Sequence, residues 1–144
     1  MTPPLPGWTI QTIHKQPDAV TVYATPPPAD PRCPRCGEPP SRWGSTRRTT
    51  RDLPIDGKRT TILWAQPGYR CEPCGSRFRP PAPGISVDHP RLSQRLVDAI
   101  VERLRAGDTI ATVATWGKLS DNTVWHVKET AGVVVTGRGR YVRR

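Results

Sequence analysis

Two short cysteine pairs constrain this chain more than any other feature. The first is Cys33-Pro-Arg-Cys36-Gly37 and the second is Cys71-Glu-Pro-Cys74-Gly75. Two intervening residues let both sulfurs of a pair reach one metal ion from a tight turn, and the following glycine permits the positive φ that such a turn needs. Four thiolates give zinc a closed tetrahedral ligand set with no open position for water. We therefore predict one structural Zn²⁺ held by Cys33, Cys36, Cys71 and Cys74.

A structural metal ion is also consistent with the composition of the chain. Only 35% of the 144 residues are hydrophobic, and the chain contains 18 prolines and 12 glycines. Such a composition limits the core that the first 90 residues can bury, so zinc binding is expected to be coupled to the folding of residues 30–80. Disulfides and a redox pair are the alternatives. The first is disfavoured by the expected cytoplasmic location, and the second by the lack of a βαβ pattern.

The charge distribution indicates a polyanionic partner. The net charge is +10, and residues 31–80 carry eleven Arg or Lys against four acidic residues. Residues 81–132 are neutral, while the tail at 133–144 adds four arginines. We expect the partner to be double-stranded DNA, because a one-sided basic excess attracts polyanions. No stretch is apolar enough for a membrane span, and MTPPLPGW is not a secretory signal. The sequence therefore predicts no membrane partner, no small-molecule substrate, and a cytoplasmic, nucleoid-associated location.

The sequence divides into four parts and predicts an α+β fold. Residues 1–30 contain two strand-like runs, 8–13 and 19–25, the second with alternating apolar and polar residues. They predict a β-hairpin that packs on the zinc ribbon formed by the next part of the chain. Residues 31–80 form the predicted antiparallel zinc ribbon, in which Asp56-Gly57 marks a hairpin turn. Residues 81–132 form a three-helix, helix-turn-helix module, and residues 133–144 a basic tail.

Helical periodicity dominates the third part. An apolar stripe with helical spacing predicts the first helix, and it comprises Leu92, Leu96, Val97, Ile100, Val101 and Leu104. Asp88 is the predicted N-cap of this helix, and Gly107 is predicted to end it. Asp108 is expected to cap a second helix over 109–115, and Ser120 a third over 121–131. The pattern from 109 to 128 fits a helix-turn-helix. Lys118 occupies the position that usually carries the turn glycine, so an altered turn is expected.

The residues predicted to contact DNA fall into two groups. Bases would be read from the third helix, and phosphates would be held by the ribbon and the tail. The alternative for the helices is a plain bundle, and for the arginines a solvated face; Trp43 and Trp64, which lie among the arginines, are interpreted as core. The candidate DNA contacts are Arg42, Arg47, Arg48, Arg51, Lys58, Arg59, Ser120, Asn122, Thr123, His126, Lys128, Arg138 and Arg140.

The order of these motifs resembles the N-terminal region of the ISL-three family of bacterial insertion-sequence transposases. The resemblance rests on CPRCG, Arg51-Asp52-Leu53-Pro54, Gly57, Leu63, Tyr69-Arg70-Cys71 and Phe78, followed by the helices. It implies recognition of transposon ends, or of a promoter or operator in a stand-alone relative. The family's ribonuclease-H-like catalytic domain would need more than a hundred further residues. We therefore expect no catalytic activity in this chain.

The sequence thus predicts a non-enzymatic, zinc-dependent, sequence-specific DNA-binding protein. The first rival is a zinc-ribbon adaptor that binds an acidic protein partner, such as a component of the transcription machinery, and a homodimer is also possible. The second rival is an enzyme with a metal at Asp52, Asp56 and Asp88, although no spacing or companion histidine recommends these residues.

Overall fold

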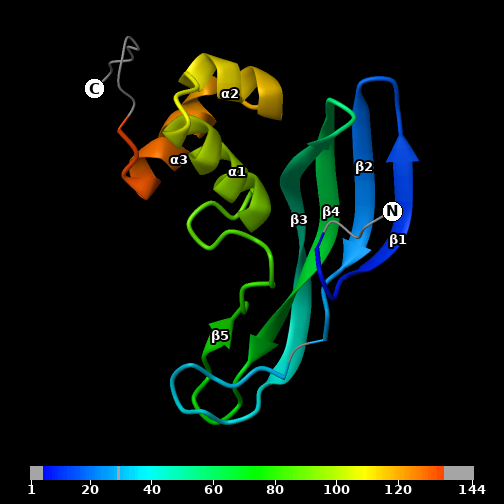
Figure 1. Ribbon diagram of the computed structural model, residues 1–144. Coiled ribbons are helices and arrows are strands. Elements are labelled where there is room, and N and C mark those ends of the chain that lie inside the picture. The colour runs from blue at the N-terminus through cyan, green and yellow to red at the C-terminus, as the bar shows by residue number, and fades with distance from the viewer. Residues whose placement is uncertain (1–4, 29, 135–144) are drawn as a thin grey trace.

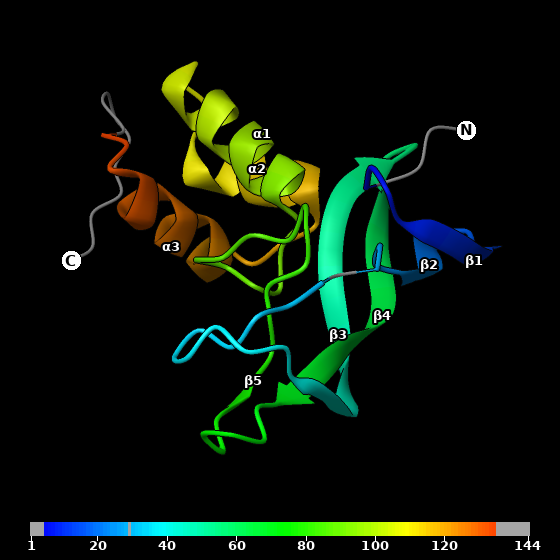
Figure 2. The same cartoon turned by 90° about the horizontal axis from the view of Figure 1, so that it is seen from below.

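The computed structural model describes residues 5–28 and 30–134, and in these ranges it has five strands and three helices. The helices lie beside the β3 side of the sheet, so the fold is α+β (Figures 1 and 2). The strands are β1 (Thr9–Lys15), β2 (Ala19–Thr25), β3 (Ser41–Ile55), β4 (Lys58–Arg70) and β5 (Arg77–Phe78). The helices are α1 (Gln94–Arg105), α2 (Ile110–Gly117) and α3 (Asp121–Ala131).

A long hairpin of β3 and β4 forms the centre of the sheet. The strands pair in antiparallel fashion from Ser41↔Arg70 at the open end to Ile55↔Lys58 at the turn. Asp56 and Gly57 both have positive φ, 53° and 72°, which defines a type I′ turn. Its twist matches that of the strands it joins. The predicted turn at Asp56-Gly57 is therefore confirmed.

The N-terminal hairpin enlarges this sheet instead of packing on one of its faces. The strand order is β1-β2-β4-β3, with β5 paired to the end of β4. β2 runs parallel to β4, from Ala19↔Arg59 to Tyr23↔Leu63. The sheet is therefore mixed because of the N-terminal hairpin, whereas the strands within residues 31–80 pair in antiparallel fashion, as predicted for the ribbon. The alternation in residues 19–25 identified the strand, but alternation does not determine which neighbour a strand takes or in which direction.

One hydrophobic core lies on a single face of the sheet, which we call the inner face. Val20, Val22, Ile62 and Trp64 point to this face and are at most 6% exposed. Leu5 and Trp8, from the chain before β1, and Ile85, from the segment before α1, pack on these residues. The rings of Trp8 and Trp64 meet edge to face, with their centroids 5.2 Å apart.

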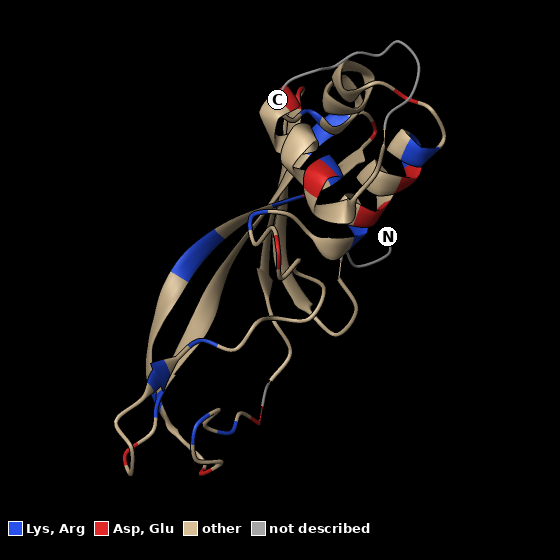
Figure 3. Cartoon of the chain, turned by 90° about the vertical axis from the view of Figure 1, so that its left-hand side faces the viewer, with Lys and Arg blue, Asp and Glu red and all other residues tan. Residues whose placement is uncertain are grey.

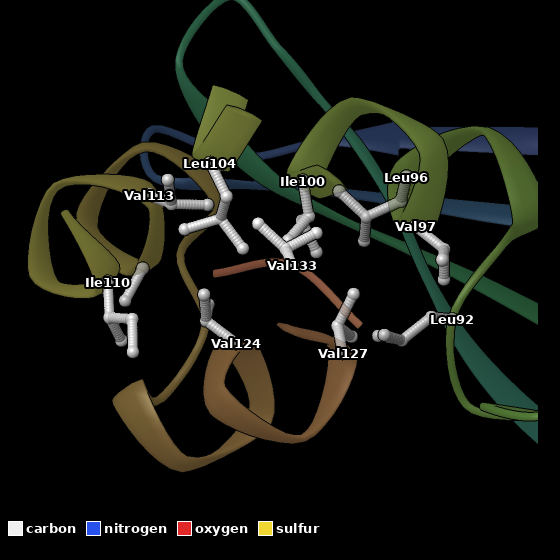
Figure 4. Packing of buried hydrophobic residues seen from close by; sticks show 11 residues of the cluster. Leu92, Leu96, Val97, Ile100, Leu104, Ile110, Val113, Val124, Val127 and Val133 are labelled. Atoms are coloured by element: carbon white, nitrogen blue, oxygen red, sulfur yellow. The ribbon is translucent and has the colours of Figure 1, made fainter. Parts of the chain in front are cut away.

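A second core joins the three helices, as Figure 4 shows. Leu96, Ile100 and Leu104 of α1 meet Val113 of α2 and Val124 of α3, and each is at most 2% exposed. The predicted apolar stripe of the first helix is confirmed for Leu96, Val97, Ile100 and Leu104; Val101 is only partly buried, and Leu92 is buried but lies before α1. No helix in the described residues is long and apolar enough to cross a membrane.

The helix caps differ in part from those predicted. Ser93 caps α1 and Thr109 caps α2, whereas Asp88 and Asp108 were predicted. Each serine or threonine accepts a hydrogen bond from the backbone N–H three residues later, the usual N-cap geometry. Asp88 lies in a bend that the His89 N–H closes on the Ser86 hydroxyl, and the chain turns again between His89 and Leu92, so the helix begins only after Ser93. The predicted cap at Ser120 and the predicted range of α3 are confirmed.

Candidate zinc centre and nucleic-acid interface

The four cysteines meet at the open end of the β3–β4 hairpin. Each pair forms the same knuckle: the N–H of Gly37 donates to the Cys33 carbonyl at 2.9 Å, and the N–H of Gly75 donates to the Cys71 carbonyl at 2.7 Å. Both glycines have positive φ, 78° and 72°. The conformation that the sequence required of these two glycines is therefore present in both knuckles.

The sulfur positions fit a single tetrahedral metal ion. All four Sγ atoms lie within 4.8 Å of one another, with Cys33 and Cys74 at 3.5 Å and Cys36 and Cys71 at 3.3 Å. Zn–S bonds of about 2.3 Å place tetrahedral sulfurs about 3.8 Å apart, close to these separations. Cys33 and Cys71 are buried, whereas Cys36 and Cys74 are exposed. The site is thus embedded on one side and open to solvent on the other.

The surroundings of the thiols favour loss of a proton at two of them. The Ser76 side chain, 3.3 Å from Cys74 Sγ, and the Ser76 backbone lower the pKa of Cys74 to about 6. For Cys33, burial raises the pKa, but the backbone N–H groups of Cys36 and Arg35 outweigh it and lower the pKa overall. For Cys71, the Cys74 N–H lowers the pKa, but burial and the neighbouring thiols together raise it to about 12. Zinc supplies the positive charge that lets all four bind as thiolates.

These features define a four-cysteine zinc-ribbon protein, with one structural Zn²⁺ between two knuckles at the end of a hairpin. Residues 29–74 match the family model described as the zinc-finger of transposase IS204/IS1001/IS1096/IS1165. The match contains both cysteine pairs and the hairpin between them. It supports the resemblance to the transposase zinc ribbon over this part of the chain. No curated protein and no solved structure matches the chain.

Basic side chains are concentrated on the sheet. The strands of the described chain carry nine Arg or Lys and a single acidic residue, Asp52. The helices carry charges of both signs, as Figure 3 shows. By sequence, α1 and α3 together contain four basic and four acidic residues. The charge asymmetry expected from the sequence is therefore also an asymmetry between the two halves of the fold.

The six candidate arginines and lysines of the ribbon do not share one surface. Arg47 pairs with Ala65 and points away from the inner face, whereas Arg48 pairs with the buried Trp64. The Arg48 guanidinium donates to Gln66 at 2.8 Å. Arg59 is exposed on the same side as Arg47; Arg42 is exposed near the cysteines, and Lys58 follows the hairpin turn.

Arg51 is used within the chain. Its guanidinium donates to the carbonyl of Gly117 at 3.4 Å and to that of Lys118, at the end of α2. Burial, together with the charge of Arg59, lowers the pKa of Arg51. This candidate DNA contact therefore joins the sheet to the turn between α2 and α3.

Trp43 was predicted to be a core residue, and this was wrong. Its side chain is 43% exposed, and the Arg77 guanidinium lies 4.1 Å from the ring centroid. Trp43 lies in the stretch between Arg42↔Tyr69 and Ser45↔Pro67 where β3 has no regular partner, and it belongs to neither hydrophobic core. Trp64 is buried as predicted, and its indole N–H donates to Thr50.

The candidate residues of α3 lie in its first turns. Asn122 and His126 are exposed, while Thr123 is half-buried with its hydroxyl 2.9 Å from that of Ser120. Ser120 caps the helix by accepting from the Thr123 N–H at 3.1 Å. Lys128 is half-buried and pairs with Glu129 at 2.7 Å. Arg138 and Arg140 lie outside the described residues.

The turn before α3 has the left-handed residue that two-helix turns of this kind need. Lys118 has φ 57° and ψ 43°, and the Leu119 N–H donates to the Ala114 carbonyl at 2.9 Å. The predicted alteration at this position thus consists of a lysine in the backbone conformation that glycine usually takes.

Sequence reasoning missed the junction around Asp52. This carboxylate is 1% exposed and accepts from Ser93 at 2.7 Å and from Arg95 at 2.9 and 2.6 Å. It therefore binds the N-terminus of α1 to β3. The Arg-Asp-Leu-Pro motif was the available signal, but its partners lie more than forty residues away. Among the described residues, the four cysteines are the only His, Cys, Asp or Glu cluster of three or more placed to share a metal.

Proposed function

We propose that the chain is a zinc-dependent, sequence-specific binding protein for double-stranded DNA, of the kind that serves as a transposase recognition module or as a transposase-derived regulator. The observation that carries the proposal is the union of a basic zinc-ribbon sheet with a two-helix unit whose second helix exposes a polar first turn. The match of residues 29–74 to a transposase zinc finger supports it. In a cell, the protein would act in the cytoplasm, on the nucleoid.

In this proposal, α2, the turn and α3 act as a helix-turn-helix. The first turns of α3 enter the major groove, where the Asn122 amide is suited to adenine and His126 lies one turn further along the same helix. The hydroxyls of Ser120 and Thr123 are bonded to each other at the helix start and hold α3 in position; in this proposal both residues lie beside the phosphates that flank the bases read by α3. The basic sheet supplies most of the attraction to the backbone, which makes affinity strongly dependent on salt.

Selection of bound fragments from sheared genomic DNA and random duplexes tests the proposal. The zinc-loaded protein is expected to enrich one motif, and its position would distinguish transposon ends from promoters. Cys71→Ser removes one buried zinc ligand and should abolish the enrichment, whereas Asn122→Ala should preserve binding to bulk DNA but lose the motif. A lack of enrichment at moderate salt would contradict sequence-specific recognition.

An acidic protein partner is the second candidate function. The exposed surface of α3 favours it, because Asp121 and Glu129 would face the phosphates of a bound duplex. In that case the basic sheet would dock on the partner's acidic surface. Retention of one protein, with no DNA, from a nuclease-free lysate would favour this function over the first.

The proposed role is binding without catalysis. Asp52, one of the carboxylates considered for an enzymatic metal, is paired with Arg95. A nuclease assay with Mg²⁺ and supercoiled DNA tests this directly. We expect the DNA to remain intact, and cleavage that disappears in Asp52→Asn would contradict the proposal.

A further inference from the structure

The sheet has a second face that neither the N-terminal segment nor the segment before α1 covers. We call it the outer face and define it by Tyr23, Arg47, Thr49, Arg59, Thr61 and Leu63. The register places these residues on one side, because Leu63 pairs with both Tyr23 and Thr49, and Ala65 pairs with Arg47. Arg47, Thr49 and Arg59 are exposed, and Tyr23 is 40% exposed.

The outer face is basic and carries no opposing charge on its strands. The one acidic residue in the strands of the described chain, Asp52, points to the inner side and is fully engaged by Ser93 and Arg95. Threonine hydroxyls lie among the arginines, and beside Arg47 there is a hollow lined by Tyr23, Thr49, Leu63 and Ala65, with Arg48 and Trp64 at its other side. Guanidinium and hydroxyl groups are among the groups that commonly donate hydrogen bonds to the phosphate oxygens of DNA.

The outer face continues into the turn that precedes α3. Arg51 comes from the same side of β3 as Arg47, and its guanidinium donates to the carbonyls of Gly117 and Lys118. Arg59 lies close enough to Arg51 for its charge to depress the pKa of that guanidinium. Lys118 is itself exposed. Basic groups therefore follow one another from the sheet to the start of α3.

The spacing of these groups suits a nucleic-acid backbone. Arg47 pairs with Ala65, six positions from Arg59 along β4, so the two arginines are about 20 Å apart along the strand direction. A backbone that leaves the first turn of α3 would pass Lys118 and Arg59 and then reach Arg47. The inner face offers no comparable path, because the hydrophobic core occupies it.

We propose that the outer face of the sheet holds the phosphate backbone of duplex DNA beside the site read by α3, with Arg47 and Arg59 as its phosphate ligands. This rests on the proposed function. It divides the basic residues of the sheet into two groups: Arg47 and Arg59 contact DNA, whereas Arg48, on the opposite side and bonded to Gln66, does not. The recognition surface thus extends from the helices across the zinc-ribbon sheet.

The matched variants are the double change Arg47→Gln with Arg59→Gln, and the single change Arg48→Gln. Affinity for a mixed-sequence duplex is measured against salt, with zinc content and thermal unfolding as checks that each variant is folded. The double variant is expected to bind about tenfold more weakly and to lower the slope of log affinity against log salt by about 2, one for each lost phosphate contact. Arg48→Gln should change neither quantity.

Photo-crosslinking gives a second measurement, which detects DNA next to a chosen residue without requiring a variant that binds DNA more weakly. Placed at Tyr23 on the outer face, p-benzoylphenylalanine should crosslink to the bound duplex, and placed at Arg48 it should not. Equal effects of Arg48→Gln and the double variant, or crosslinking at position 48 alone, would overturn the proposal while leaving DNA binding intact. If the wild-type protein binds no duplex at low salt, the proposed function itself fails, and this surface with it.

Discussion

Lys118 adopts a backbone conformation that costs an ordinary residue free energy. Its φ of 57° places Cβ close to the following carbonyl, a strain of about 1–2 kcal/mol that glycine avoids. We expect Lys118→Gly to raise the free energy of unfolding by about 0.5–1 kcal/mol, since part of the gain is offset by the greater freedom of glycine in the unfolded chain. Denaturant unfolding measures this.

The matched control is Thr115→Gly, three residues earlier on the exposed side of α2. There the helix needs ordinary dihedrals, so glycine should destabilise the protein, by about 0.3–0.5 kcal/mol because threonine is itself a poor helix former. The same sign of change in both variants would contradict the assignment of strain to Lys118.

Asp52 is a buried carboxylate that depends on its two partners. Asp52→Asn leaves Arg95 without its counter-charge and weakens the support of the α1 cap at Ser93. Because Arg95 is partly exposed and can turn toward water, we expect a loss of about 2–3 kcal/mol in the free energy of unfolding. Asp56→Asn, in the exposed turn, should change it by less than about 0.5 kcal/mol.

At the scale of elements, the N-terminal hairpin completes the core of the sheet. Val20 and Val22 from β2, with Leu5 and Trp8, cover Ile62 and Trp64 of β4. Removing residues 1–28 takes away or uncovers several large apolar side chains, at roughly 1.5–3 kcal/mol each, and the sum is comparable with the whole free energy of unfolding of a small domain. We therefore expect the shortened chain not to fold even with excess zinc, as judged by circular dichroism and amide dispersion in NMR spectra.

Deletion of residues 135–144 is the control, because it removes no residue of the two described cores. Native-like dispersion in the chain lacking 1–28 would mean that the zinc ribbon folds independently of the hairpin.

Elements that depend on local chemistry were predictable from the sequence. The knuckles, the Asp56-Gly57 turn, the buried stripe of α1 and the range of α3 follow from spacing, turn residues and helical period. The parallel pairing of β2 with β4 and the Asp52–Arg95 ion pair join distant positions, and no local pattern encodes them. Trp43 shows the same limit: its residue type favours burial, but it lies outside both hydrophobic cores and is 43% exposed.

At the scale of the molecule, zinc and the two hydrophobic cores stabilise different regions. The cysteines close the open end of the β3–β4 hairpin, whereas the helical core contains no residue of that end. We expect a strong chelator to raise amide exchange in residues 33–46 and 68–78, while α1, α2 and α3 keep their helical circular dichroism signal. Loss of the helical signal together with zinc would show a single cooperative unit.

The parallel pairing of β2 with β4 also has a kinetic consequence. The β3–β4 hairpin closes across two residues, but Ala19 and Arg59 are forty positions apart in the chain. During synthesis β2 leaves the ribosome before β4 has been made. Val20 and Val22 therefore stay exposed to water while the β3–β4 hairpin and its zinc knuckles form. Docking of the N-terminal hairpin is then the late step in sheet assembly, and the nascent chain is most exposed to aggregation during that interval.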